Sequence, residues 1–454
     1  MPVESGVQAR SVASYLGAWV LVLGLLLPSV ARPEGEATTP GQSSAPGPTD
    51  ARELEAFLDG LMTGQLEAYR IPGAVVAVVK DGRLLLAKGY GYADLERREP
   101  VIPEKTLFRI GSVSKLFTWT AVMQLAEQGR LDLDADVNTY LRDFQIPATW
   151  PQPITPRHLM CHTAGFEEWN LRSTVSSADK LEPLSKVLTR NMPARVHPPG
   201  LVGAYSNYGA GLAGHIVEQV SGMPFEQYID ENILGPLDMR HSTFRQPLPP
   251  GLAADMSTGY IIKGGRPVAV PFELLRPAPA GAMTTTATDM AKFMVAHLQN
   301  GRYGDHHLLR EDTAKQMHSR LFAYDPRLGG GCAYGFGVAA YRGQRMLEHA
   351  GGTDIISSDL VLLPESNVGL FVASTVRAEG PRGIPGRISG RPSSSTIIRP
   401  PPHQRPRPCP RPREGPAASR GPTGTPGSTT PRSRSWCGSA RRPGWRPART
   451  EASS

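Results

Sequence analysis

Residues 111–129 read GSVSKLFTWTAVMQLAEQG. The segment after Lys115 is apolar on nearly every side of a helix, so we predict a buried helix that ends at Gly129. Ser112 and Lys115 are three residues apart and therefore share one face of this helix. At a helix N-terminus the backbone N–H groups and the dipole favour a developing negative charge. The apolar positions are Leu116, Phe117, Ala121, Val122 and Leu125.

The pair of Ser112 and Lys115 suits covalent acyl transfer. A lysine in a desolvated pocket has a lowered pKa and can accept the proton of a serine hydroxyl. The alternative is structural: a serine that caps the helix, followed by a lysine whose ammonium group reaches solvent. Because a serine and a lysine at this spacing are common by chance, the pair gains weight only from other elements of the chain.

A second candidate element, Tyr205-Ser206-Asn207, follows a Pro-Pro-Gly turn and precedes a predicted helix over 210–220. This position predicts a loop, where functional groups are commonly displayed. Tyr205 and Asn207 are two residues apart, and both side chains can point into one cleft. The structural alternative is a half-buried aromatic residue beside a turn asparagine.

A third candidate element, residues 348–353 with the sequence EHAGGT, ends a predicted strand with two glycines. Glycine lets a substrate approach a strand closely, and a strand edge offers free backbone N–H groups. One of these groups and the Ser112 N–H could form an oxyanion hole with two donors. A plain glycine-rich turn is the structural alternative.

Strand patterns lie at both ends of the chain, with helical patterns between them. Helices are predicted after the capping residue Asp50, over 210–220 and over 289–298. This order predicts an α+β fold whose antiparallel sheet joins the two ends of the sequence. The predicted strands are residues 74–79, 84–87, 345–349, 359–363 and 368–374.

In this order and in these settings, the three elements resemble the motifs of the serine β-lactamase and penicillin-binding-protein superfamily, most closely its class C β-lactamase-related branch. The resemblance covers residues 51–376. It implies the β-lactamase/transpeptidase-like fold, an antiparallel sheet flanked by helices with an inserted all-α region. Supporting stretches are residues 108–111 (FRIG), 131–134 (LDLD), 154–165 (ITPRHLMCHTAG) and 334–338 (YGFGV).

The resemblance implies a serine hydrolase that works through an acyl-enzyme and uses neither a cofactor nor a metal. Ser112 corresponds to the acylated nucleophile, Lys115 to its proton acceptor, and Tyr205 to the general base or proton relay. The backbone N–H groups of Ser112 and Gly352 correspond to the oxyanion hole. The alternative is a non-catalytic penicillin-binding protein or a truncated pseudoenzyme of the same fold.

The resemblance also places Asn207, His349 and Gly351 against a small-molecule or peptide substrate, whose amide Asn207 would hydrogen-bond. His349 stands where β-lactamases usually have the lysine of a Lys-Thr-Gly motif, and Ala350 lacks the hydroxyl group. A neutral imidazole recognises a carboxylate less well than an ammonium group does. We therefore expect esters or peptides as substrates, D-amino-acid peptides or β-lactam-like acyl donors among them, and not β-lactam resistance as the main role.

Residues 1–31 have the pattern of a signal peptide, with Arg10, an apolar run over 16–27 and a small-residue site before position 32. An uncleaved N-terminal membrane anchor is the alternative. Either feature predicts an exported protein, periplasmic or secreted. Residues 32–50 are rich in Pro, Gly, Ser and Thr, as a flexible linker is.

The composition changes after the predicted domain of residues 51–376. Residues 377–454 hold 16 of the 44 prolines, and their 16 Arg and 3 Glu give +13, which leaves −5 of the net +8 for the rest. We predict a disordered tail, because such a segment buries too little apolar surface to order itself. Proline also prevents it from forming the helix that covers the sheet at this point of the family. The charge indicates weak, salt-dependent polyanion binding by the tail and no specific nucleic-acid partner.

The chain has four cysteines, and their spacing fits neither a zinc site nor a disulfide framework. The sequence leaves open whether two of them pair in an exported protein, and it does not indicate the oligomeric state. The four are Cys161, Cys332, Cys409 and Cys437, of which the first two are the candidates for a bridge.

His158 and His162 are four residues apart and could share a helical face, which raises the question of a metal site. No glutamate follows His158 in the manner of metalloproteases. The family resemblance implies that this stretch has a structural packing role, so we expect no metal site here. We interpret the neighbouring Glu167 and Glu168 as a solvated turn.

Overall fold

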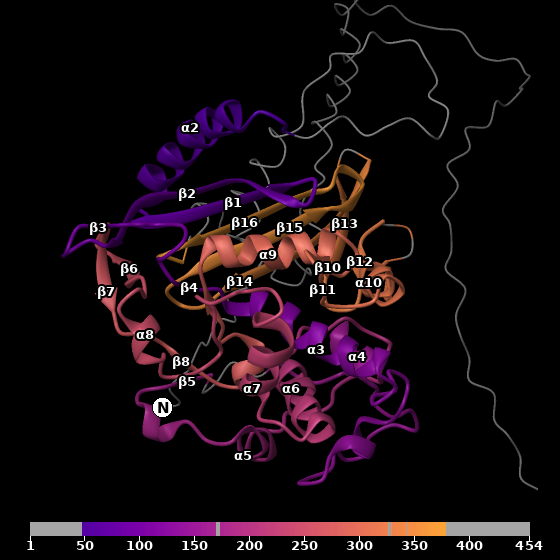
Figure 1. Ribbon diagram of the computed structural model, residues 1–454. Coiled ribbons are helices and arrows are strands. Elements are labelled where there is room, and N and C mark those ends of the chain that lie inside the picture. Colours follow the sequence, from indigo (N-terminus) through magenta and orange to yellow (C-terminus); the bar gives the residue numbers. More distant parts are fainter. Residues whose placement is uncertain (1–47, 169–172, 326, 328, 342, 378–454) are drawn as a thin grey trace, which may run out of the picture. The chain divides into compact units, whose positions relative to one another are not determined.

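The computed structural model of the protein describes residues 48–168, 173–325, 327, 329–341 and 343–377. Its main feature is an eight-stranded antiparallel sheet, in which β1 pairs with β16 (Figure 1). The predicted joining of the two ends of the sequence is therefore confirmed. The strands lie in the order β12 (Gly331–Cys332), β13 (Gly337–Tyr341), β14 (Gln344–Gly352), β15 (Ser357–Leu363), β16 (Val368–Ser374), β1 (Gly73–Lys80), β2 (Arg83–Asp94) and β3 (Glu99–Pro100).

Strand β1 is apolar and buried up to Val79 because both faces of the sheet are covered there. Val75, Ala77 and Val79 belong to the larger core cluster, together with residues of helix α9 (Ala287–Leu298). The alternating residues Ala74, Val76 and Val78 belong to a second cluster, together with residues of helix α2 (Ala51–Tyr69). A continuous run of buried residues is typical of a strand that is covered on both faces.

Helix α2 begins where the sequence predicts. The Asp50 side chain accepts hydrogen bonds from the backbone N–H groups of Arg52 and Glu53, which satisfies two otherwise unpaired donors of the first turn. Leu54, Leu58 and Met62 face the sheet and are buried. Figure 1 shows α2 on one face of the sheet and α9 on the other.

The helices between β3 and β12 form the helical region beside the sheet (Figure 1). The buried helix predicted after Lys115 is α3, although Ser112 lies in the 3-10 turn that precedes it and not in the α-helix itself. The helices are α3 (Lys115–Glu127), α4 (Pro156–Met160), α5 (Leu184–Arg190), α6 (Asn207–Ser221), α7 (Phe225–Ile229), α8 (Pro250–Ala253), α9 and α10 (Glu311–His318).

Short single turns and two-stranded ribbons lie between these helices and between strands β15 and β16. The ribbons are β4 (Phe108–Arg109) with β9 (Thr284–Thr285), β5 (Thr174–Val175) with β8 (Leu274–Leu275), β6 (Gly259–Lys263) with β7 (Arg266–Val270), and β10 (Arg302–Tyr303) with β11 (His306–His307). The turns are η2 (Gly111–Ser114), η3 (Val137–Tyr140), η4 (Ala178–Lys180), η5 (Asp230–Leu234), η6 (Ala278–Ala280) and η7 (Pro364–Ser366).

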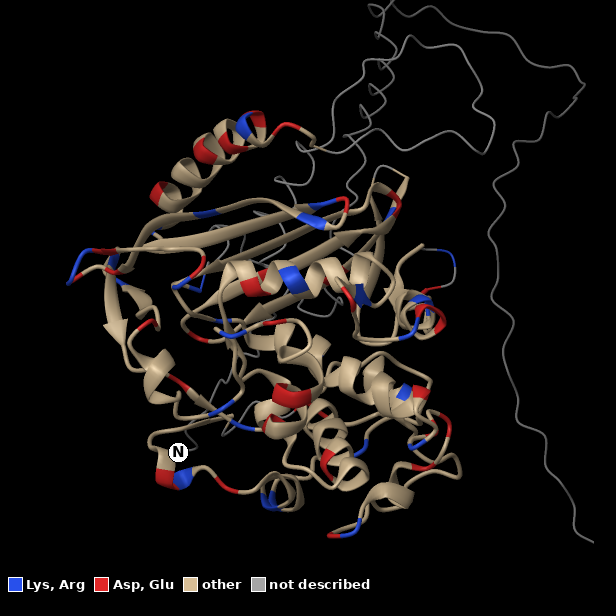
Figure 2. Cartoon of the chain, in the orientation of Figure 1, with Lys and Arg blue, Asp and Glu red and all other residues tan. Residues whose placement is uncertain are grey.

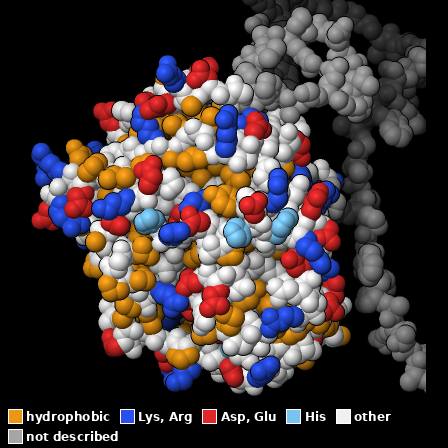
Figure 3. Space-filling view, viewed as in Figure 1, with side chains coloured by type: hydrophobic (Ala, Val, Ile, Leu, Met, Phe, Trp, Pro, Cys, Tyr) orange, Lys and Arg blue, Asp and Glu red, His pale blue; other side chains and the backbone are white. Residues whose placement is uncertain are grey.

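The predicted leader, nearly all of the linker and the tail after Arg377 lie outside the described residues. Among the described helices, none combines the length and the apolar character that crossing a bilayer requires. Val361, Leu370 and Val372 of the main sheet are buried in the same cluster as the apolar residues of α2. Charged residues of both signs are interspersed over the described elements and over the face seen in Figure 3 (Figures 2 and 3).

Candidate active site

Lys115 and Ser112 lie in direct contact at the start of α3. The Lys115 Nζ donates hydrogen bonds to Ser112 Oγ at 2.9 Å, to Asn207 Oδ1 at 2.7 Å and to the Ala280 carbonyl oxygen at 2.6 Å. Lys115 is completely buried, whereas Ser112 is half-buried. The three bonds use all three donors of the ammonium group and hold it against the serine hydroxyl. The structure thus brings together the first two motifs found in the sequence.

Burial lowers the pKa of Lys115 to about 7, because a charged ammonium loses its hydration there. The negative charge of Glu168 acts in the opposite direction and is the smaller effect. A lysine with this pKa is partly neutral near pH 7. Its amine can then accept a proton from the adjacent hydroxyl of Ser112, which is the chemistry that a serine nucleophile requires.

Tyr205 lies over the buried lysine. The Lys115 Nζ is 4.8 Å from the centroid of the Tyr205 ring. The centroids of the His162 and Tyr205 rings are 4.3 Å apart, and the two ring planes are tilted relative to each other. Although 40 % of Tyr205 is exposed, burial of its phenol raises its pKa above the ordinary value, and a hydrogen bond with Ser112 lowers it by less. The phenol is therefore protonated at pH 7. Of the two roles that the resemblance implies for Tyr205, this protonation state favours the proton relay.

The glycine-rich end of β14 packs directly against the turn that carries the serine. Gly111 has a φ of +51°, and a Cβ atom on it would lie 2.6 Å from the backbone nitrogen of Gly352. The Gly352 backbone thus lies next to the residue that precedes Ser112. Its role as an oxyanion donor together with the Ser112 N–H stays a prediction. Gly111 has a physical reason to be glycine, since a side chain would collide here.

Gly351 fills a tighter place than the sequence indicates. A Cβ atom on it would lie 2.1 Å from the Ile110 carbonyl oxygen and 2.4 Å from the Ser358 hydroxyl. The Ser358 hydroxyl also donates a hydrogen bond to Ile110 at 2.7 Å, which fixes β15 to the serine-bearing turn. Gly351 is buried at this junction, and its contact with substrate stays a prediction.

His349 is neutral, as expected from its surroundings. Burial and the nearby Lys115 lower the pKa of its imidazole to about 4. Its Nδ1 lies 2.8 Å from the Ala350 carbonyl oxygen, which can only accept, so Nδ1 carries the proton. The other ring nitrogen, Nε2, then has a lone pair and no proton. A histidine in this tautomer cannot donate a hydrogen bond from Nε2 to a carboxylate.

Two site residues are not apparent from the sequence motifs. The carbonyl oxygen of Ala280 is an acceptor for Lys115, and a backbone atom leaves no signature in a sequence. Glu168 is exposed, as predicted for a solvated turn, but its carboxylate also accepts a hydrogen bond from Asn207 Nδ2 at 2.8 Å. Its closeness to residues 162–165 (HTAG), part of a stretch that resembles the family, is the only hint that the sequence offers.

Arg109 and Ser114 support the site from behind. The buried guanidinium of Arg109 donates to the carbonyl oxygens of Glu273 at 2.7 Å and of Ala282, and so fixes the segment that presents Ala280. The Ser114 hydroxyl accepts a hydrogen bond from the Met283 N–H at 3.1 Å. Ser114 is completely buried and has a structural partner of its own.

His158 and His162 have separate structural partners. His158 completes the capping box of α4 with Thr155. His162 accepts a hydrogen bond at Nδ1 from the Ser206 N–H at 3.2 Å, next to Tyr205, and its carbonyl oxygen accepts from Ala204. Within the residues that the structure describes, no group of three or more His, Cys, Asp or Glu side chains could hold a metal ion.

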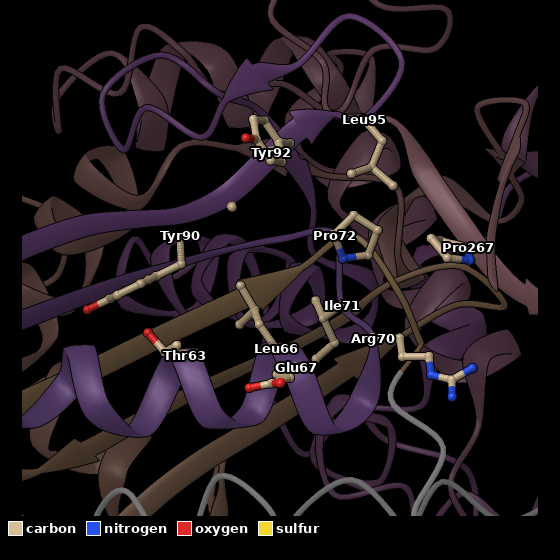
Figure 4. A pocket seen from close by; sticks show the side chains of 11 residues that line it. Thr63, Leu66, Glu67, Arg70, Ile71, Pro72, Tyr90, Tyr92, Leu95 and Pro267 are labelled. Atoms are coloured by element: carbon tan, nitrogen blue, oxygen red, sulfur yellow. The ribbon is translucent and has the colours of Figure 1, made fainter. Parts of the chain in front are cut away.

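A separate surface pocket of about 520 Å³ lies between the end of α2 and strand β2 (Figure 4). Its lining includes Leu66, Ile71, Pro72 and Tyr92, and Arg70 lies at its margin in the view shown. None of the candidate catalytic residues contributes to this lining. We therefore do not assign the chemistry to this pocket.

Known proteins are similar to this chain in sequence and in fold. The family model described as Beta-lactamase matches residues 58–388. Protein flp of Staphylococcus aureus strain MRSA252 is 29% identical over 328 residues, which are 71% of this chain and 63% of that protein. A β-lactamase of Yersinia enterocolitica is 30% identical over 246 residues, 54% of this chain and 60% of that protein. The chain thus spans less than two thirds of the length of these relatives.

A solved structure gives the same result for the fold. The octameric penicillin-binding protein homologue from Pyrococcus abyssi matches with a TM-score of 0.63 and 26% identity, over 72% of this chain and 74% of that one. The predicted arrangement, an antiparallel sheet flanked by helices, is confirmed. Since the family match covers most of its length, the chain belongs to the β-lactamase family and has the β-lactamase/transpeptidase fold.

Proposed function

We propose that the protein is an exported serine hydrolase that acts on esters or peptides through an acyl-enzyme. The observation that carries this proposal is the contact of a completely buried Lys115 with the Ser112 hydroxyl at 2.9 Å, together with a lysine pKa of about 7. Burying a lysine costs free energy, because its ammonium group loses its hydration, so a completely buried lysine indicates a function that requires it. Activation of a nucleophile is such a function.

The proposed reaction begins with Ser112. Its Oγ attacks the carbonyl carbon of the acyl donor, and its proton passes to the neutral Nζ of Lys115. The N–H groups of Ser112 and Gly352 stabilise the resulting oxyanion. Protonated Tyr205 relays a proton to the departing alcohol or amine. Water then cleaves the acyl-enzyme, with the same groups moving its proton.

The charges around Ser112 favour acyl donors that place no carboxylate near His349. His349 is neutral at pH 7 and has no proton on Nε2, and Glu168 adds a negative charge beside Asn207. Both features disfavour the carboxylate of a β-lactam or of a C-terminal residue. Uncharged esters and peptides, including D-amino-acid peptides with a blocked or distant carboxylate, fit this environment better.

Export belongs to the proposal because of the signal-peptide pattern of residues 1–31, with an N-terminal anchor as the alternative. Fractionation of cells that produce the tagged full chain tests this point. Recovery of the full-length, uncleaved protein from the cytosol alone would contradict export.

Intact-protein mass spectrometry tests the chemistry. The full chain is incubated with a fluorophosphonate, which phosphonylates activated serines, and separately with a panel of short-chain esters, D-alanine-terminated peptides and a chromogenic cephalosporin. The proposal predicts one phosphonyl adduct on Ser112 and turnover of at least one ester or peptide. An adduct without turnover of any acyl donor would instead support the non-catalytic binding protein.

A further inference from the structure

The buried thiols of Cys161 and Cys332 converge on a single backbone oxygen. Cys161 Sγ lies 3.0 Å from the Ala333 carbonyl oxygen, and Cys332 Sγ lies 2.9 Å from the same atom. The distance between the two sulfur atoms therefore cannot exceed the sum of these two distances. Both residues are buried, with exposed fractions of 1% and 3%. They are free thiols in this structure.

The two thiols also interact with each other. A hydrogen bond with Cys332 is among the causes that raise the pKa of Cys161, after the larger effect of burial. A disulfide needs the two sulfur atoms about 2.05 Å apart, and rotation of each side chain about its Cα–Cβ bond moves a sulfur atom by distances of this order. Such rotation would release both thiols from Ala333. The pair thus has the proximity that two randomly placed cysteines lack.

We propose that Cys161 and Cys332 form a disulfide bond that fastens the helical region to the main sheet beside the active site. Cys161 follows α4 and directly precedes His162, whose backbone and ring hold the Tyr205 loop. Cys332 lies in the edge strand β12, where it pairs with Gly337 of β13. Gly337 in turn pairs with Glu348, the neighbour of His349. The bond would therefore connect the two sides of the site, the Tyr205 loop and the His349 strand.

The oxidation is a thiol–disulfide exchange with a low-molecular-weight disulfide such as oxidised glutathione. One thiolate attacks this disulfide, forms a mixed disulfide and releases one glutathione thiolate. The second thiolate then attacks the protein sulfur of the mixed disulfide and releases the second glutathione. Two protons pass from the cysteines to the two glutathione thiolates. Since burial raises the pKa of Cys161, we expect slow exchange in the folded protein and faster exchange while the chain folds.

The stability effect follows from the length of chain that the bond would enclose. Cys161 and Cys332 are 171 positions apart in the sequence, and a loop of this size loses much conformational freedom in the unfolded state when it is closed. For a domain of this size we expect the melting temperature to rise by about 5 °C or more. The proposal does not depend on the hydrolase activity.

The experiment uses the full chain with Cys409→Ser and Cys437→Ser, so that only the buried pair remains. The protein is folded and held in glutathione redox buffers of increasing oxidation until its mass is constant, then unfolded in denaturant that contains an alkylating reagent, so that buried free thiols also react. We expect the loss of two hydrogens with no alkylation, a peptide that links Cys161 to Cys332, and the rise in melting temperature. Reductant should abolish all three changes.

Matched variants keep the test decisive. Cys161→Ser and Cys332→Ser should each remove the linked peptide and the redox-dependent part of the melting temperature, whichever way the single change affects basal stability. Alkylation of both cysteines at every redox ratio would overturn the proposal. So would glutathione adducts that never resolve into the internal disulfide.

Discussion

The side-chain amide of Asn207 donates from Nδ2 to the carboxylate of Glu168 at 2.8 Å. At its other end, Oδ1 accepts a hydrogen bond from the catalytic candidate Lys115 at 2.7 Å. One of the two N–H donors of the amide that the family resemblance assigns to the substrate is thus already bonded to Glu168 in the free protein. An acyl donor must displace Glu168 from Asn207 or bind beside its negative charge.

We predict that Glu168→Gln lowers the pH at which the enzyme becomes active. The Glu168 charge raises the pKa of Lys115, so its removal should shift the rising limb of the kcat/KM profile to lower pH. Carboxylate-bearing donors should gain more than neutral esters, because a like charge is removed. The pH profiles of an ester and of a cephalosporin measure both effects.

The exposed neighbour Glu167 supplies the control for this change. Glu167→Gln should leave the profile where it is in the unaltered protein. Identical profiles for Glu168→Gln and Glu167→Gln would show that Glu168 does not act on Lys115.

Two serines of one motif provide a second prediction. Ser112→Ala should abolish covalent labelling, whereas Ser114→Ala should retain most of it, because the Ser114 hydroxyl faces Met283 and not the cleft. Loss of this buried hydrogen bond should instead lower the free energy of unfolding by about 1–3 kcal/mol. Labelling rates by mass spectrometry and urea unfolding measure the two effects. Equal loss of labelling in two folded variants would refute the assignment of Ser112.

The protonation of Lys115 leads to a third prediction. With a pKa of about 7, the neutral amine fraction rises through this pH, so kcat/KM for a neutral ester should rise about tenfold per unit below pH 6 and level off above pH 8. A profile that remains flat from pH 5 to pH 9 would exclude Lys115 as the base.

The same pKa has a consequence for stability. The folded value of about 7 lies below the ordinary value of 10.5, so between these limits the unfolded chain binds more protons than the folded one at this position. The contribution of Lys115 to the free energy of unfolding should therefore rise with pH from about 7 to 10.5. Comparing the pH dependence of unfolding with that of Lys115→Met isolates this contribution. A difference between the two proteins that is constant with pH would contradict the lowered pKa.

Much of the fold could be predicted because its elements have local signatures. The β-branched run that became β1 and the Asp50 cap are such signatures, and the pairing of β1 with β16 follows from the order of the elements. The boundary at Ser112 was wrong in detail, since Ser112 lies in a 3-10 turn. Gly352 packs closely against Gly111 at this turn, and such a contact between residues far apart in sequence is not visible in a local pattern.

The site was predictable only in part for the same reason. Side chains within motifs, such as Lys115 and Asn207, could be named from their spacing and their resemblance to a family. The Ala280 carbonyl oxygen and the Glu168 carboxylate reach Lys115 and Asn207 through tertiary packing. The tautomer of His349 depends on the position of one carbonyl oxygen, which the sequence does not specify.

The last prediction concerns the position where His349 replaces the lysine usual in β-lactamases. His349→Lys introduces a cation that can donate a charge-assisted hydrogen bond to a carboxylate, which the lone pair on the Nε2 of His349 cannot do. Hydrogen bonds to charged groups contribute about 1.5–3 kcal/mol, so the rate of β-lactam acylation relative to ester hydrolysis should rise by about 10- to 100-fold.

The neutral variant His349→Gln separates charge from shape in this test, because it removes the ring without adding a cation. The ratio for His349→Gln should stay near that of the unaltered protein, while the ratio for His349→Lys rises and then falls again at high salt concentration, as an interaction between charges does. A second cation would also act on Lys115, so the ester rate is measured over the full pH range and the ratio is taken between plateau values. An unchanged ratio in His349→Lys, with the protein folded and the ester still hydrolysed, would remove His349 from the surface that contacts the substrate.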